Sequence, residues 1–239
     1  MTAPLATEPP PDGNLLVVAP HLDDGVFGCG RLLASRPGAT VATVFAGRPP
    51  ADRPLTDWDR DAGFSPGDDV IGRRREEDRQ ALEILEARPY WLDLLDHQYG
   101  GPDEATVTAA LRELFVACRP DVVLIPLGLF HSDHQLVHRS ALSLLPDYPE
   151  FRWLVYEDFL YRRIAGLRDQ AIAALESRGL DSRPVRFAEA ADAAARKAAA
   201  VACYRSQLRG IASPGRLGLA DLEEPEGYWA LSPAPGRPP

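Results

Sequence analysis

The sequence predicts an α/β fold, a Rossmann-like three-layer sandwich built on a mainly parallel sheet. Two observations carry this prediction. Short apolar runs alternate with amphipathic segments along most of the 239 residues, and this alternation is typical of βαβ units. Polar residues that can bind a metal also follow two of the apolar runs, which is where open parallel sheets place their ligands.

The first half of the chain opens with Leu15–Ala19, a continuous apolar run that fits a strand buried on both faces. A helix is expected up to Arg36, because Pro37 follows it. Residues 41–46 predict a second strand. Residues 48–72 are rich in Pro, Gly and Asp and predict a long surface loop, which at this length is often functional.

The second half continues the alternation, with apolar residues at helical spacing among charges. Helices are expected over residues 73–87 and 104–118, in a segment that ends at Leu145, and over about 188–208. Strands are expected over residues 90–96, 122–126 and 151–156. No internal repeat or linker is visible, so a single domain is expected over residues 14–231, with flexible tails at 1–13 and 232–239.

Composition narrows the class of protein. The net charge of −9 argues against nucleic acid and against an anionic membrane surface as partners. No apolar stretch approaches the roughly 20 residues of a membrane span, and the start lacks the pattern of a signal peptide. Cys29, Cys118 and Cys203 are far apart and odd in number, which favours a reduced cytoplasmic setting. A homo-oligomer is left open.

Two clusters of metal-capable residues follow the strands at 15–19 and 122–126. They are His21, Asp23 and Asp24, and then His131, Asp133, His134 and His138. His21 and Asp24 are three residues apart in a tight turn and can converge on one ion. Zn²⁺ accepts such nitrogen and oxygen ligands and keeps an open position in catalytic sites. The third ligand is expected from His131, His134 or His138.

Each of these residues also has a simpler interpretation. Asp is a favoured helix N-cap, so Asp23, Asp24 or Asp133 would serve as caps. His21 would be a satisfied buried histidine, and His138 a surface or packing residue, which we favour for His138. The concentration of four of the five histidines at two strand ends argues for a metal site.

Several motifs occur in a fixed order across residues 14–210. They are the strand followed by His21-Leu22-Asp23-Asp24-Gly25, the helix with Arg74, Glu77 and Ala81, the acidic Asp96, the segment His131-Ser132-Asp133-His134, and the late Lys197, Tyr204, Ser206 and Gln207. This ordered set resembles the PIG-L/LmbE-like family of zinc-dependent N-deacetylases.

The resemblance implies a role for each matching residue. His21, Asp24 and His134 would bind zinc or another divalent metal. Asp23 would be the general base toward the attacking water, and His131 the protonated partner that stabilises the oxyanion. Arg74 and Asp96 would position the substrate.

Three departures from the family pattern stand out. Leu22 replaces a proline, and Gly25 replaces a glutamate. Some relatives place a tyrosine shortly before the second histidine motif, where it helps to hold the oxyanion. Here Leu129 and Phe130 occupy that stretch, and neither side chain can donate a hydrogen bond.

The expected function is removal of an acyl group, an acetyl, from the amide nitrogen of a small sugar-containing substrate, such as an N-acetylglucosaminyl glycoside or a natural-product intermediate. An amidase acting on a larger thiol conjugate is an alternative. A nucleotide-binding module on a doubly wound sheet is disfavoured, because no Gly-x-Gly-x-x-Gly follows the first strand. The intact set of metal-capable residues argues against a non-catalytic scaffold.

Overall fold

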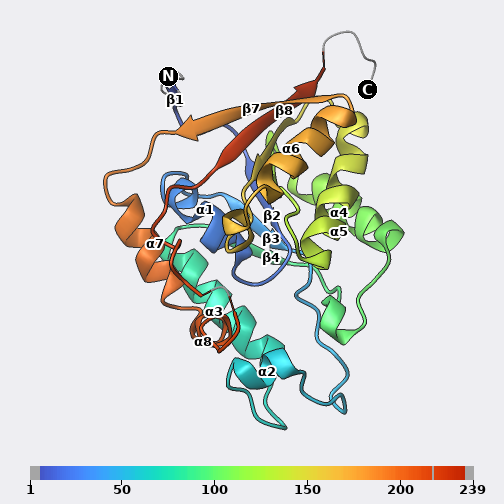
Figure 1. Cartoon of the computed structure of the whole chain (residues 1–239), viewed down its shortest axis with the longest axis vertical. Helices are drawn as coiled ribbons and strands as arrows, with labels where there is room; N and C mark the ends of the chain where they lie inside the picture. Colours follow the sequence, from blue (N-terminus) through green and yellow to red (C-terminus); the bar gives the residue numbers. More distant parts are fainter. Residues whose placement is uncertain (1–5, 217, 235–239) are drawn as a thin grey trace.

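The computed structural model describes residues 6–216 and 218–234, which form one mixed sheet with helices on both faces (Figure 1). The strands are β1 (Thr7–Glu8), β2 (Leu15–Ala19), β3 (Thr40–Thr43), β4 (Arg88–Trp91), β5 (Val122–Pro126), β6 (Arg152–Tyr156), β7 (Leu180–Phe187) and β8 (Tyr228–Pro233). Their order in the sheet is β1-β7-β8-β6-β5-β2-β3-β4. Only β8 runs antiparallel to its neighbours, β6 and β7. The prediction of a mainly parallel sheet is confirmed.

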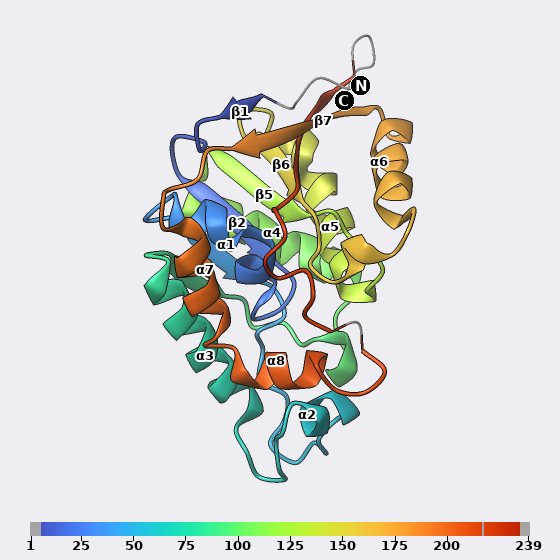
Figure 2. The ribbon, with the colours of Figure 1, turned by 60° about the vertical axis from the view of Figure 1, so that its left-hand side comes forward.

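Two helical layers cover the sheet. The helices are α1 (Asp24–Ala34), α2 (Asp57–Asp61), α3 (Val70–Ile84), α4 (Glu104–Cys118), α5 (Ser132–Leu144), α6 (Leu167–Ser177), α7 (Ala193–Val201) and α8 (Arg205–Ile211), with 3-10 turns η1 (His97–Tyr99), η2 (Leu145–Asp147) and η3 (Tyr161–Arg163). Helices α1, α3 and α7 lie on one face, and α4, α5 and α6 lie on the other (Figures 1 and 2). Each face has its own apolar core, one around Phe27 and Leu82 and the other around Leu111 and Val137. The three-layer prediction is therefore confirmed.

Strands β2, β5 and β6 lie side by side near the middle of the sheet. Val17 pairs with Leu124, and Leu124 pairs with Leu154, all in parallel register. These three side chains are fully buried, which explains the wholly apolar runs. Because parallel strands end at the same edge of a sheet, the segments that follow β2, β5 and β6 meet there.

The segment 48–72 is not the structureless loop that was expected. It contains α2 and the first turn of α3. The Thr56 side chain accepts from the Asp59 backbone N–H, and the Asp59 side chain accepts from that of Thr56, which forms a capping box at the start of α2. A small apolar cluster packs beside α2, made of Ala62, Phe64 and Val70.

Two strands are shorter than expected. The strand predicted over 41–46 ends at Thr43, and the one predicted over 90–96 ends at Trp91. Thr43 and Trp91 form the last pair between β3 and β4. The neighbouring strand β2 ends before Pro20, which has no backbone N–H to extend the ladder.

The helix expected over about 188–208 is two helices, α7 and α8. Tyr204 lies at the break, fully buried, and its hydroxyl donates to Asp78 Oδ1 at 2.7 Å. The segment holds no Gly or Pro to signal the interruption, which is set by this tertiary contact. The elements α6, β7 and β8 were not predicted. Strand β7 contains Pro184 and several charged residues, so its sequence lacks the apolar pattern of a strand.

The expected tails contribute to the sheet where the structure describes them. Thr7 and Glu8 pair with β7, and Ser232 and Pro233 are paired in β8. Residues 1–5 and 235–239 of these tails lie outside the described residues. In the described part of the chain, no helix has the length and apolar character needed to cross a bilayer.

Candidate active site

The turn from β2 into α1 places the first cluster. His21 and Asp24 face each other across this turn: Asp24 Oδ2 accepts from the His21 backbone N–H at 2.8 Å and lies 3.2 Å from His21 Nδ1. Asp23 is the residue before the helix, but its side chain makes no capping hydrogen bond. A Cβ atom at Gly25 would lie 2.6 Å from a methyl group of Val41, so the glutamate of the family pattern does not fit unless the Val41 side chain moves.

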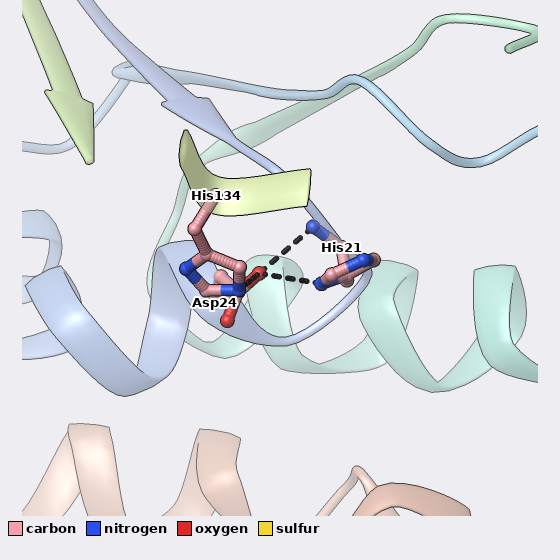
Figure 3. Close-up of side chains that lie close together, drawn as sticks. All are labelled: His21, Asp24 and His134. Carbon is pink, nitrogen blue, oxygen red and sulfur yellow. Dashed lines mark hydrogen bonds and ion pairs between the residues drawn. The ribbon is translucent and has the colours of Figure 1, made fainter. Parts of the chain in front are cut away.

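The start of α5 places the second cluster. His131 precedes the helix, and its Nδ1 accepts from the Asp133 backbone N–H at 3.2 Å. His134, one residue further along the helix, reaches across the sheet edge, so that its Nε2 lies 3.3 Å from Asp24 Oδ2. Figure 3 shows His21, Asp24 and His134 converging from the end of β2, the start of α1 and the start of α5. Their ligand atoms lie within 4.8 Å of one another.

A second carboxylate orients each of the two converging imidazoles. Asp133 Oδ2 lies 2.9 Å from His21 Nε2, and Asp158 Oδ1 lies 2.5 Å from His134 Nδ1. The remaining ring nitrogens, His21 Nδ1 and His134 Nε2, are the ones that face Asp24. Histidines that bind a metal almost always donate their other ring N–H to such an acceptor. The donor set therefore fits a divalent metal, with two imidazoles, one carboxylate and room for further ligands.

The carboxylates of Asp24 and Asp158 favour positive charge on the imidazole between them, that of His134. Burial opposes protonation of His134, but the charges of Asp24 and Asp158 outweigh it and raise the pKa of His134 to about 9. Burial also opposes charge on Asp24, yet His134 and His21 hold its pKa well below the usual range. A metal ion satisfies the same carboxylates, so it competes with protons for these imidazoles.

Asp23 and His131 line the same cavity. The pKa of each is shifted in the direction that favours the uncharged form of the side chain. Burial and then the charge of Asp24 raise the pKa of Asp23 well above its usual range. Burial and then the charges of His21 and His134 lower the pKa of His131 to about 4. Because Nδ1 of His131 accepts a backbone hydrogen bond, the neutral ring carries its proton on Nε2.

The cavity at this edge of the sheet has a volume of about 280 Å³. Its polar lining contains all seven residues that the sequence singled out as ligands, catalytic groups or substrate contacts, namely His21, Asp23, Asp24, Arg74, Asp96, His131 and His134. Trp58 of α2 and Ile211 of α8 also line it, so these two short helices border the site.

Arg74 and Asp96 both form polar contacts with other residues of the chain. Arg74 is buried and its guanidinium lies 3.1 Å from Asp59, while its Nε, also buried, has no hydrogen-bond partner in the described part of the chain. Asp96 accepts from the backbone and side-chain N–H groups of Gln98, each at 2.8 Å.

The remaining histidines lie at different places. His138 Nδ1 bonds the carbonyl oxygen of Pro126 at 2.9 Å, which makes it a packing residue, as we favoured. His97 lines the cavity, and its backbone N–H donates to Asp133. Sequence reasoning missed Asp158, although an acidic residue that follows the strand β6 is the kind of signal that identified the other two clusters.

The profile of the family described as PIG-L: GlcNAc-PI de-N-acetylase matches residues 16–145, more than half of the chain. The chain belongs to this family. The match spans both clusters of metal-capable residues and the helix α3 that carries Arg74. The PIG-L assignment therefore agrees with the resemblance seen in the sequence motifs.

Solved structures extend the PIG-L likeness beyond the matched segment. The deacetylase of the A40926 pseudoaglycone, Dbv21, is 26% identical, with a TM-score of 0.72, and the match covers 94% of this chain and 99% of that one. The zinc-inhibited form of the teicoplanin deacetylase Orf2 is 20% identical, with a TM-score of 0.76 and coverage of 94% and 100%. The N,N'-diacetylchitobiose deacetylase of Pyrococcus horikoshii is 18% identical, with a TM-score of 0.54 and coverage of 82% and 71%. A search of curated proteins finds no match to this chain.

Proposed function

We propose that this PIG-L family protein is a zinc-dependent N-deacetylase that removes an acetyl group from the amide nitrogen of an acetamido sugar. One observation carries the proposal. His21, Asp24 and His134 converge, with an orienting carboxylate on each imidazole, in the cavity that Asp23 and His131 also line. A metal-ligand set, a base and a hydrogen-bond donor around one cavity are the parts that amide hydrolysis needs.

His21, Asp24 and His134 would hold the metal. When bound, the ion supplies Lewis acidity, which lowers the pKa of a water molecule and polarises an acyl oxygen. Asp23 accepts the proton of the attacking water as the water oxygen forms a bond to the acyl carbon. Burial and the charge of Asp24 raise the pKa of Asp23, and a carboxylate with a raised pKa is a stronger base toward water than an exposed one.

His131 donates a hydrogen bond from Nε2 to the acyl oxygen as negative charge develops there. With a pKa of about 4 it is neutral near pH 7, so we propose a neutral donor in place of the protonated imidazole that the resemblance implies. The proton that Asp23 has taken passes to the nitrogen as the C–N bond breaks. The products are acetate and a free amine.

The substrate class is supported by the cavity and by a relative. A relative 26% identical to this chain is a deacetylase of a pseudoaglycone. Trp58 and Arg216 also line the cavity, with the Arg216 guanidinium 5.0 Å from the centre of the Trp58 ring, and this cation would donate hydrogen bonds to sugar hydroxyls. Arg74 lines the cavity while it keeps its ion pair with Asp59, so its guanidinium would donate to a sugar hydroxyl.

A panel of amides tests this proposal. The zinc-loaded protein is incubated with N-acetylglucosamine, with N-acetylglucosaminyl glycosides that carry apolar or aromatic aglycones, and with acylated thiol conjugates that lack a sugar. Release of free amine from the acetamido sugars is the expected result. Turnover confined to the conjugates would transfer the assignment to the amidase alternative, and no amine release from any member would contradict deacetylation.

A further inference from the structure

An aromatic side chain from the connection between β6 and α6 lies over the second histidine cluster. The ring of Tyr161 is 5.3 Å from that of His134, nearly perpendicular to it, and 6.2 Å from that of His131, at an interplanar angle of 25°. Tyr161 lines the same cavity as the proposed metal ligands. It comes from a part of the chain about 30 residues after the motif that supplies both histidines.

The backbone at this position is held in an unfavourable conformation. Leu160, directly before Tyr161, has a φ of 70°, in the left-handed region that residues with a Cβ seldom adopt. Arg162, directly after it, fixes the turn by an ion pair with Asp221 at 3.0 Å and a hydrogen bond to the carbonyl of Pro225 at 2.8 Å. Backbone strain that the surroundings maintain is concentrated at functional sites.

The phenol of Tyr161 has no hydrogen-bond partner in the described part of the chain, although its ring is half-buried. Burial, and then the charges of Asp24 and Asp23, raise the pKa of the Tyr161 phenol above its usual value, so the phenol keeps its proton. Because no group in the described part of the chain uses this hydroxyl, it can donate to a group that enters the cavity.

The residues just before the second histidine motif cannot fill this role. Leu129 and Phe130 have no donor, and the Phe130 side chain is 62% exposed. Phe130 instead packs against Tyr161, with ring centroids 5.4 Å apart and an interplanar angle of 32°. Phe130 therefore supports the tyrosine ring that lies beside the histidines.

We propose that Tyr161 donates its phenolic hydrogen bond to the acyl oxygen and stabilises the oxyanion together with His131. The inference rests on the proposed function, because the oxyanion arises only if an amide is hydrolysed here. The phenol keeps its proton throughout. The water oxygen bonds to the acyl carbon, the carbonyl electron pair moves to the oxygen that Tyr161 and His131 contact, and the pair returns as the C–N bond breaks.

The test compares Tyr161→Phe with Tyr90→Phe, a control that removes the hydroxyl of an exposed tyrosine on β4. Removing one oxyanion donor costs about 10²-fold in kcat. Tyr161→Phe is therefore expected to lose roughly that much kcat, with KM, zinc content and Tm near the wild-type values. Tyr90→Phe is expected to match the wild type in all four. Wild-type turnover in Tyr161→Phe, or loss of zinc and Tm in parallel with turnover, would overturn the proposal.

A binding measurement keeps this inference separate from the deacetylase assignment. Methylphosphonate, a tetrahedral oxyanion, is titrated into the zinc-loaded wild type and both variants by calorimetry. A hydrogen bond to a charged group contributes enough to make Tyr161→Phe bind about 10-fold more weakly. Equal affinity in Tyr161→Phe and wild type would reject Tyr161 as an oxyanion donor, even if acetamido sugars are turned over. The expected weakening would support it, even if every sugar in the panel is refused.

Discussion

Asp158 Oδ1 lies 2.5 Å from His134 Nδ1, and both side chains are almost completely buried. The other oxygen of Asp158 accepts from the Leu129 backbone N–H at 3.0 Å. Asp158 thus ties the loop before α5 to the imidazole on α5 and turns His134 Nε2 toward Asp24. The orientation of the His134 imidazole, which lies on the helix after β5, is therefore set by Asp158, which follows the neighbouring strand β6.

Asp158→Asn is expected to weaken zinc binding about 10- to 100-fold, because an amide loses the charged acceptor that orients the imidazole. Competition with a chelating dye measures the affinity. Asp169→Asn, at an exposed position on α6 whose carboxylate pairs with Arg168, is the matched control and is expected to bind zinc like the wild type. Equal zinc affinity in Asp158→Asn and wild type would contradict the orienting role.

His134→Ala and His131→Ala are expected to fail in different ways. His134→Ala removes a ligand, so the purified protein is expected to lack zinc. His131→Ala removes the proposed hydrogen-bond donor and the contact of His131 Nδ1 with the Asp133 backbone N–H, but no proposed ligand, so it is expected to keep zinc and lose about 10²- to 10³-fold in kcat. Metal analysis of both proteins decides the matter. Full zinc occupancy in His134→Ala would refute the ligand assignment.

Asp23→Asn is expected to bind zinc normally and to lose about 10²- to 10⁴-fold in kcat, the range of a general base. Asn keeps the volume of the side chain but cannot accept the proton of water. Single-turnover assays with zinc-loaded protein measure the loss. Unchanged turnover would exclude Asp23 as the base, and loss of zinc would make it a ligand instead.

Asp78 is expected to make stability depend on pH. It is buried beneath α7 and α8, accepting from Trp91 Nε1 and the Tyr204 hydroxyl, each at 2.7 Å. Burial raises its pKa to about 6 despite these hydrogen bonds. The folded protein therefore holds this proton more tightly than the unfolded chain, and the stabilisation is complete below the ordinary carboxyl pKa and is lost as pH rises through about 6.

The difference between the pKa of Asp78 in the folded protein and in the unfolded chain corresponds to roughly 3 kcal/mol in the free energy of unfolding. Asp78→Asn is expected to remove this loss between pH 4 and 7, which urea titrations at several pH values can measure. Glu83→Gln, at an exposed position on the same helix, is the control and is expected to keep the wild-type pH dependence. A wild-type slope in Asp78→Asn would show that the carboxyl does not titrate in this window.

Most of the site was predictable from sequence because His21 and Asp24 lie just after one apolar strand and His134 lies at the start of the helix after another. Parallel pairing of β2 with β5 then brings the clusters together without further information. The choice of His134 over His131 and His138 came from the family motif, since spacing alone left all three open.

Asp158 follows β6 as the other polar clusters follow β2 and β5, but sequence reasoning did not use this signal. Tyr161 was not predicted, because its position depends on the turn at Leu160 in the connection after β6. No periodicity marks that connection. The short helix α2 was hidden for a different reason: five residues are too few for a periodic signal, and only the pair Thr56 and Asp59 marks its start.

The most direct test of the deacetylase assignment measures metal content and acetate release on one preparation with an acetamido-sugar substrate. We predict one zinc per chain and acetate and free amine in equal amounts. Chelation should abolish this activity and added zinc should restore it. Equal acetate release by the metal-stripped protein, or by His134→Ala, would contradict the account.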